Sequence, residues 1–147
     1  MHRALGIEEF LAVRSVLPVI DVRSPGEFAR GHIPGAHGMP LFSDDERAIV
    51  GTLFKQQGRD QAVLEGLRMV GPQLASLVER ARALAPAGRI AVHCWRGGER
   101  SASVAWLLDK AGFGEVYTLK QGYKDFRNLV RRSFVTPLDL RILGGYT

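Results

Sequence analysis

The alternation of two kinds of apolar segment constrains the fold of this chain more than any other feature. Short apolar runs bounded by Gly, Pro or charged residues predict strands at about 16–22, 38–41, 89–93 and 115–119. Between the second and third runs, apolar residues recur every three or four positions over 60–85, which predicts two helices or one kinked helix. A further helix is predicted at 100–111. Strands that alternate with helices predict an α/β domain, with a mostly parallel central sheet and helices on both faces.

The chain has the size of one domain, with 147 residues. Glu8 and Glu9 lie where a secretory signal would need apolar residues, and no run approaches the roughly 20 apolar residues of a membrane span. We therefore expect a cytoplasmic protein that does not associate with membranes. The histidines lack the spacing of metal ligands, and we expect neither a metal nor a cofactor.

The chain is basic, with a formal net charge of +5. Basic residues are spread along it, with a denser group at Arg127, Arg131, Arg132 and Arg141. Such a charge permits a polyanionic partner, but scattered arginines are more often a solvated surface. Charge alone therefore leaves nucleic-acid binding open.

The single cysteine, Cys94, follows a predicted strand and opens a loop rich in glycine. A lone cysteine is usually a small buried hydrophobe. Here, however, Gly97 and Gly98 allow the backbone to curl so that successive N–H groups point at one anion. The helix predicted to begin near Arg100 adds the positive end of its dipole. Donors of this kind stabilise a thiolate, or a persulfide or perselenide carried on it, so we predict Cys94 to be a nucleophile.

The neighbours of Cys94 have predicted roles in binding or support. Arg96 and Arg100 can hold the oxygens of an anion, while Ser101 can cap the helix or bond the thiolate. Trp95 can cover the site, stack on a base or simply pack. The predicted substrate-binding residues are Trp95, Arg96, Gly97, Gly98, Glu99, Arg100 and Ser101, and the predicted supporting residues are Asp21, Arg23 and His93. For His93 we favour ordering the loop or packing in the sheet over acting as a base.

Residues 21–36 resemble the opening signature of rhodanese domains, D-x-R-x-x-x-E-F-x-x-G-H-I-P-G-A. With the Cys94 loop and Gly122-Tyr123, the resemblance extends over about residues 5–132. It implies a rhodanese fold in which Cys94 accepts sulfur.

A narrower resemblance is to the N-terminal rhodanese part of tRNA 2-selenouridine synthases. It depends on an insert at 42–60 that typical rhodaneses lack, on the loop Cys-Trp-Arg-Gly-Gly-x-Arg-Ser at 94–101, and on 121–124, which match a Gly-Gly-Tyr-Lys segment with one departure. The resemblance implies that the complete synthase replaces sulfur by selenium at the wobble 2-thiouridine of certain tRNAs. It further implies selenophosphate as donor and a geranylated intermediate, with Cys94 handling the chalcogen.

The last residues predict the start of a second domain. Residues 138–143 resemble a strand, and Gly144-Gly145-Tyr146-Thr147 is similar to the beginning of the Walker motif in the second part of those synthases. We therefore expect a rhodanese domain at 1–137 and the start of a truncated P-loop domain at 138–147. The phosphate-binding lysine of that motif is not among these residues, so a missing or separate P-loop domain is an expected partner.

Three other functions stay open. The chain can be a stand-alone thiosulfate-type sulfurtransferase. His93-Cys94, five residues and Arg100-Ser101 also fit the signature of cysteine phosphatases and arsenate reductases, although the insert at 42–60 favours the synthase. The last alternative is a partner-binding module without enzymatic activity.

Overall fold

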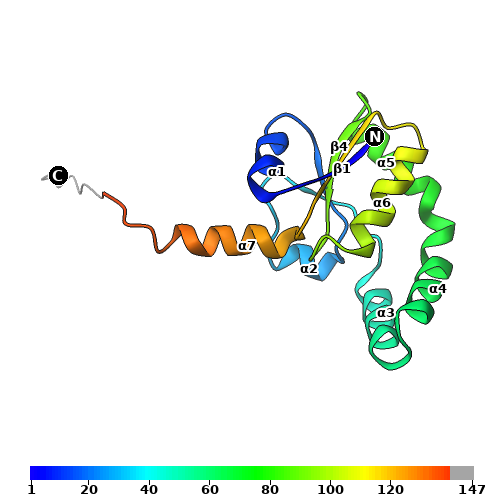
Figure 1. Cartoon of the computed structure of the whole chain (residues 1–147). Coiled ribbons are helices and arrows are strands. Elements are labelled where there is room, and N and C mark those ends of the chain that lie inside the picture. The colour runs from blue at the N-terminus through cyan, green and yellow to red at the C-terminus, as the bar shows by residue number, and fades with distance from the viewer. Residues whose placement is uncertain (140–147) are drawn as a thin grey trace, which may run out of the picture.

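The computed structural model describes residues 1–139. Within them, five strands form one sheet in the order β1-β5-β4-β2-β3, and every neighbouring pair is parallel (Figure 1). The strands are β1 (His2–Leu5), β2 (Val19–Asp21), β3 (His37–Gly38), β4 (Arg89–His93) and β5 (Glu115–Leu119). The predicted α/β class with a parallel sheet is confirmed.

Helices connect the strands and cover both faces of the sheet (Figure 1). They are α1 (Ile7–Arg14), α2 (Pro25–Ala29), α3 (Asp44–Gln57), α4 (Arg59–Val70), α5 (Leu74–Leu84), α6 (Glu99–Lys110) and α7 (Gly122–Ser133). The helical stripe at 60–85 is interrupted by a 3-10 turn, Gly71–Gln73, which contains Pro72, so the two-helix form of the prediction is confirmed. The helix predicted at 100–111 corresponds to α6.

Strand alternation divides the core into two parts. Ile20, Ile90 and Val92 face a cluster with residues of α4, α5 and α6, whereas Val19 and Ala91 face a cluster with Phe10 of α1. Side chains of α7 pack on the second cluster. Successive side chains of a strand point to opposite faces, so this division confirms the prediction of helices on both sides.

The first predicted strand is shorter than expected. The amides of Val16 and Leu17 donate to the carbonyl of Val13 at 3.1 and 3.0 Å, so these two residues close the end of α1. The strand therefore begins only after Pro18. The second predicted strand, 38–41, is likewise reduced to His37–Gly38.

The insert at 42–60 forms α3, which pairs with α4 as a helical hairpin (Figure 1). Ser43 and Glu46 cap α3 reciprocally, each side chain accepting the other's backbone N–H at 3.2 and 3.1 Å. The Asp44 carboxylate accepts the backbone N–H of Gly26 at 2.9 Å, which connects the hairpin to α2. The insert thus lies against the segment that carries the resemblance at 21–36.

Within residues 1–139, no helix is long and apolar enough to cross a bilayer. The strand predicted at 138–143 extends past the described residues, and the glycine segment at 144–147 lies outside them.

Candidate active site

Cys94 lies at the carboxyl end of β4, in the middle of the sheet. The chain leaves β4 towards β5 on one side, whereas it leaves the neighbouring strand β2 towards β3 on the other. Crossovers that diverge in this way open a crevice at the carboxyl ends of the two strands, where parallel α/β proteins bind ligands. The loop of Cys94 occupies this position and leads directly into α6.

Two glycines allow this loop to fit against the start of α7. Gly97 and Gly122 have φ values of +69° and +61°, a region that favours glycine. A Cβ on Gly97 would collide with backbone carbonyls between β5 and α7, and one on Gly122 would collide with the carbonyl of Cys94. The first amides of α7 then hold the loop, because Tyr123 N–H donates to the Cys94 carbonyl at 2.8 Å and Lys124 N–H to the Trp95 carbonyl at 3.0 Å.

The sulfur of Cys94 has one side-chain hydrogen-bond partner, Ser101, within the described residues. The two atoms, Sγ and Oγ, are 3.2 Å apart, and the same hydroxyl is 3.2 Å from the carbonyl of Gly98. Gly98 is the N-cap of α6, so the side chain of Ser101 does not cap the helix. One hydroxyl proton serves one acceptor at a time; Ser101 can donate to the Gly98 carbonyl beside a thiol and to the sulfur beside a thiolate.

Arg100 bonds a carboxylate from another element. Its Nη1 donates to Glu27 Oε2 at 2.8 Å, and Arg47 of α3 approaches the same oxygen at 3.5 Å. Burial alone would raise the pKa of Glu27, but the hydrogen bond and charge of Arg100, the backbone N–H of Ser24 and the charge of Arg47 lower it to about 2. Glu27 therefore ties α2, α3 and the start of α6 together.

The other two charged residues of the loop point elsewhere. The Glu99 carboxylate pairs with Arg59 of α4 at 2.6 Å, and both side chains are largely exposed. Arg96 is exposed and makes no side-chain hydrogen bond or ion pair with any other residue of the described range. The structure thus brings Ser101 to the sulfur and leaves the charged groups of Arg96, Glu99 and Arg100 in separate environments.

Beneath the loop, Asp21 and Arg23 form a fully buried ion pair. Arg23 donates to Asp21 through its backbone N–H and its guanidinium, the shortest contact being 2.6 Å. The same guanidinium donates to the Gly31 carbonyl at 2.8 Å and lies 4.0 Å from the ring centre of Tyr123. A buried charge needs such complete pairing, so this pair joins β2 to the loop after α2 and to α7.

His93 lies on the opposite side of the sheet from the sulfur. Its ring packs edge-on against Phe10, and its Nδ1 is 3.4 Å from the Cys94 carbonyl. Burial lowers the pKa of His93 more strongly than the nearby Asp21 raises it, so the imidazole is neutral at pH 7. Nε2 is 3.6 Å from Asp21 and has no hydrogen-bond partner among the described residues.

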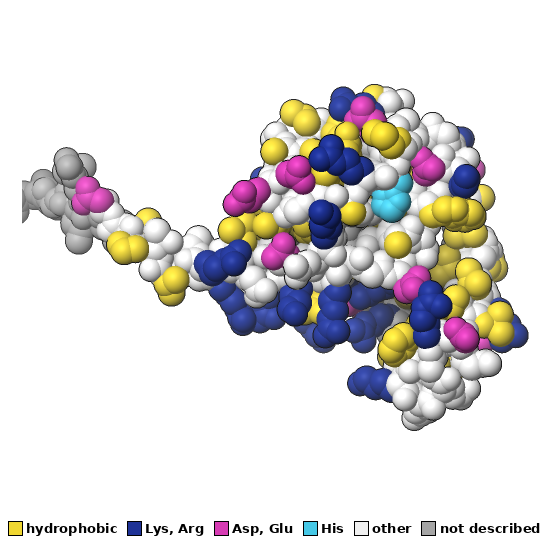
Figure 2. Space-filling view, in the orientation of Figure 1, with side chains coloured by type: hydrophobic (Ala, Val, Ile, Leu, Met, Phe, Trp, Pro, Cys, Tyr) yellow, Lys and Arg dark blue, Asp and Glu magenta, His cyan; other side chains and the backbone are white. Residues whose placement is uncertain are grey.

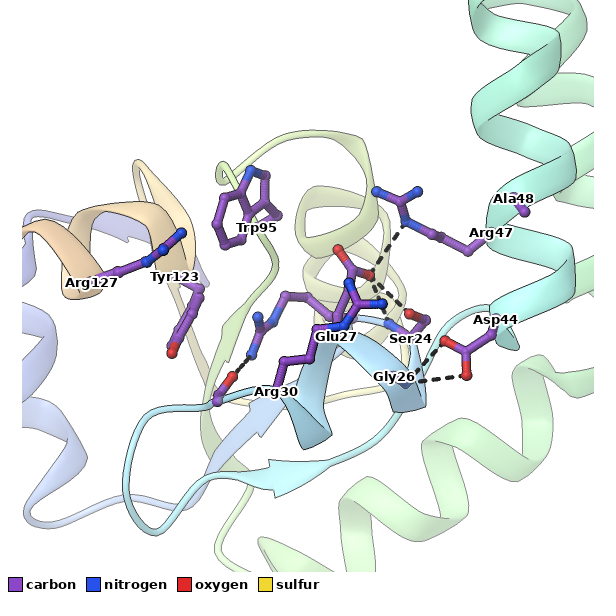
Figure 3. Close-up of a pocket in the computed structure, with 12 residues that line it drawn as sticks. Ser24, Gly26, Glu27, Arg30, Asp44, Arg47, Ala48, Trp95, Tyr123 and Arg127 are labelled. Atoms are coloured by element: carbon purple, nitrogen blue, oxygen red, sulfur yellow. Dashed lines mark hydrogen bonds and ion pairs between the residues drawn. The ribbon is translucent and has the colours of Figure 1, made fainter.

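A pocket of about 780 Å³ opens beside the loop (Figure 3). Trp95, Tyr123 and Arg127 lie on one side of it, and Arg47 of α3 on the other (Figure 3). Cys94 is only 3% exposed and is not among the lining residues, whereas Trp95, the next residue, lines the pocket. No group of three metal-ligating side chains occurs among residues 1–139.

Several of these residues were not singled out from the sequence. Glu27 belongs to the motif at 21–36, but its partner Arg100 lies far away in sequence. Arg30 and Arg47 looked like scattered surface charge, although both line the pocket. Placing them required the tertiary arrangement.

A parallel α/β sheet with a cysteine in a glycine-rich loop before a helix defines a class of domains that use thiolate chemistry. Within that class, the family profile described as the rhodanese-like domain matches residues 7–129, and the chain belongs to this family.

Its relatives include tRNA 2-selenouridine synthases. The chain is 40% identical over 138 residues to the protein of that name from Bordetella bronchiseptica and 42% identical over 140 residues to that from Sulfurovum. Each match covers 88% of this chain but only 37% of the relative's length. The resemblance to the rhodanese part of these synthases is thereby confirmed.

A similar solved structure is the N-terminal domain of a putative ATP/GTP binding protein from Clostridium difficile. It is 39% identical, with a TM-score of 0.78 over 86% of this chain and 98% of that one. A rhodanese-related protein from Thermoplasma volcanium, 17% identical with a TM-score of 0.54 over 86% of this chain and 92% of that one, shows the shared fold alone.

Proposed function

We propose that this domain is a sulfur or selenium transferase that carries the chalcogen on Cys94, as the rhodanese part of a tRNA 2-selenouridine synthase. The observation that carries the proposal is the placement of Cys94. Its sulfur lies 3.2 Å from the Ser101 hydroxyl, at the end of a central parallel strand and before the N-terminus of α6. The identity of 40% to named synthases supports the assignment to this reaction.

The transfer step is a nucleophilic displacement at the chalcogen atom of the donor. The Cys94 thiolate attacks the terminal sulfur or selenium of the donor, and a bond from sulfur to that chalcogen forms. The bond between the chalcogen and the rest of the donor breaks, and its electron pair leaves with sulfite when thiosulfate is the donor. The product is a terminal anion on Cys94, which the Ser101 hydroxyl and the loop amides stabilise.

The remaining loop residues bind the donor in this scheme. The backbone of Gly97 and Gly98 provides the curl, and the exposed guanidinium of Arg96 is free of other partners within residues 1–139 to receive the donor's oxygens. Arg100 acts through its bond to Glu27, which holds the first turn of α6 in place. The loop opens to admit the donor, because Cys94 is buried.

The second substrate in this proposal is tRNA, and the setting is the cytoplasm. In the relatives the matched region is about a third of the protein, and one solved relative is described as the N-terminal domain of a putative ATP/GTP binding protein. We propose that residues 138–147 begin the nucleotide-binding part, and that the complete exchange on tRNA requires it.

The experiment that tests the proposal is intact-protein mass spectrometry after incubation with selenophosphate and, separately, with thiosulfate. We expect the added mass of one selenium or one sulfur atom, absent in Cys94→Ala. The absence of an adduct with both donors would refute the chalcogen-carrier role. A chromogenic phosphate ester tests the phosphatase alternative, and clear turnover that is lost in Cys94→Ala would favour it instead.

A further inference from the structure

The pocket beside the loop has a cationic wall. Arg30, Arg47 and Arg127 all line it, and all three are exposed. Arg30 and Arg127 have no carboxylate partner among residues 1–139, whereas Arg47 shares Glu27 at 3.5 Å. Figure 2 shows Lys and Arg side chains gathered along the underside of the body, beneath α2 and the start of α7. The pocket therefore presents unneutralised positive charge.

This charge continues along α7. Lys124, Arg127 and Arg131 are three and four residues apart, so they lie on one face of the helix. All three are exposed and unpaired with acids in the described part of the chain. Because α7 extends away from the body (Figure 1), the row leads outwards from the pocket. We call Arg30, Arg47, Lys124, Arg127 and Arg131 the cationic track.

Two aromatic rings stand where the track meets the active loop. The ring centres of Trp95 and Tyr123 are 5.9 Å apart, and both residues line the pocket (Figure 3). Trp95 directly follows Cys94 and is half-buried. Aromatic rings beside a positive groove are the combination by which proteins bind single-stranded nucleic acids, because bases stack on the rings and phosphates contact the cations.

The two acids of the pocket already have partners within the domain. Glu27 is occupied by Arg100 and Arg47, and Asp44 accepts the backbone N–H of Gly26. Both carboxylates are therefore held by internal partners.

We infer that the cationic track and the Trp95–Tyr123 pair form a docking surface for single-stranded RNA. One unpaired base stacks on Trp95 next to Cys94, while the phosphates on either side contact the arginines of the track. The inference rests on the proposed function for its choice of RNA, and it adds where the RNA lies and why the target base must be unpaired. A base within a duplex cannot reach an aromatic ring beside a buried sulfur without leaving its stack.

The test measures RNA affinity on protein that carries Cys94→Ala, so that no chalcogen chemistry takes part. The probes are a fluorescein-labelled RNA hairpin with an unpaired, uridine-containing loop and a fully paired RNA duplex of the same length. Fluorescence anisotropy measures the binding of each probe over a range of salt concentrations. Added to this background are Trp95→Ala, Trp95→Phe and the pair Arg127→Ala with Arg131→Ala. The charge-matched control is Arg14→Ala with Arg80→Ala, neither of which lines the pocket.

The surface predicts a different result for each probe and variant. Trp95→Ala lowers the affinity for the hairpin by about five- to 150-fold, the range for one stacked base. Trp95→Phe restores most of this affinity. The duplex is insensitive to both changes. The Arg127 and Arg131 pair weakens hairpin binding and flattens the dependence of log affinity on log salt by about 1.4, while the control pair has no comparable effect.

The inference is overturned if the control double variant lowers the affinity for the hairpin as much as the Arg127→Ala, Arg131→Ala double variant does. It is also overturned if Trp95→Ala leaves that affinity unchanged. An equal loss of affinity for the hairpin and the duplex in Trp95→Ala also overturns the inference. Failure of the chalcogen adduct on unmodified Cys94, with these affinities as predicted, refutes the proposed transfer chemistry and not the docking surface. Circular dichroism of each variant checks that the fold is retained.

Discussion

Replacing Glu27 by Gln isolates the charge that ties α2 and α3 to the start of α6. The substitution keeps the size of the side chain and removes its charge, so Arg100 loses its ion pair at 2.8 Å and Arg47 its longer contact at 3.5 Å. The pKa of Glu27 is lowered from its ordinary 4.5 to about 2 because these partners outweigh the effect of burial. The folded protein therefore favours the charged form of Glu27.

That fall in pKa corresponds to about 3 kcal/mol at neutral pH. Because the pocket opens to solvent beside Glu27, screening reduces the value, and we expect Glu27→Gln to lower the free energy of unfolding by about 2 kcal/mol. For a domain of this size, the midpoint of thermal unfolding should fall by about 4–8 °C.

The pH dependence supplies a second, independent signature. A carboxyl group with a lowered pKa stabilises the fold above its ordinary pKa, and this stabilisation is lost as the pH falls from 4.5 towards about 2. The difference in stability between the wild type and Glu27→Gln should thus be full at pH 7 and less than half of that by about pH 3.

Urea unfolding at both pH values, followed by circular dichroism, measures this difference. Glu65→Gln is the matched control, because Glu65 pairs with Arg68 at the surface at 3.1 Å, and such pairs contribute less than about 1 kcal/mol. A Glu27→Gln protein as stable as the control at pH 7, or a difference that stays constant down to pH 3, would refute the reasoning.

Four further substitutions test the loop and its support. Gly97→Ala should destabilise the fold by more than about 2 kcal/mol, since its Cβ would collide with backbone atoms at a φ of +69°. Gly98→Ala has open space around it and should cost less than about 1 kcal/mol. Thermal unfolding of the two variants compares these costs. Ser101→Ala should slow formation of the adduct about three- to tenfold, as the loss of one hydrogen bond predicts, in a time course by mass spectrometry that an unchanged rate would contradict. Asp21→Asn should cost about 3–5 kcal/mol in urea unfolding because it leaves Arg23 buried without its charge partner; a cost near zero would show that the pair is not needed.

Periodicity and local motifs were sufficient to predict the central part of the fold. The strands β4 and β5 and the helix α6 have the bounds expected from their apolar runs, within one residue. The edge strand β1 was missed because only Leu5 of its four residues is buried. Its hydrogen bonds go to β5, near the other end of the chain, and no local pattern contains that pairing.

The candidate site divides in the same way. The loop of Cys94 could be predicted because its glycines and its following helix are consecutive in sequence. The bond from Arg100 to Glu27 and the two amides of α7 that hold the loop carbonyls could not, since they join segments far apart in the chain. Those contacts determine how the loop is held and where Arg100 points.

The near-complete burial of Cys94, 3% exposed, has a consequence for storage. A terminal chalcogen on a cysteine is open to attack by any thiol that reaches it. With Cys94 almost fully buried, small reductants in bulk water have little access to the sulfur. In the proposed transfer reaction, the burial that slows loading of Cys94 would therefore also prolong the lifetime of the loaded state.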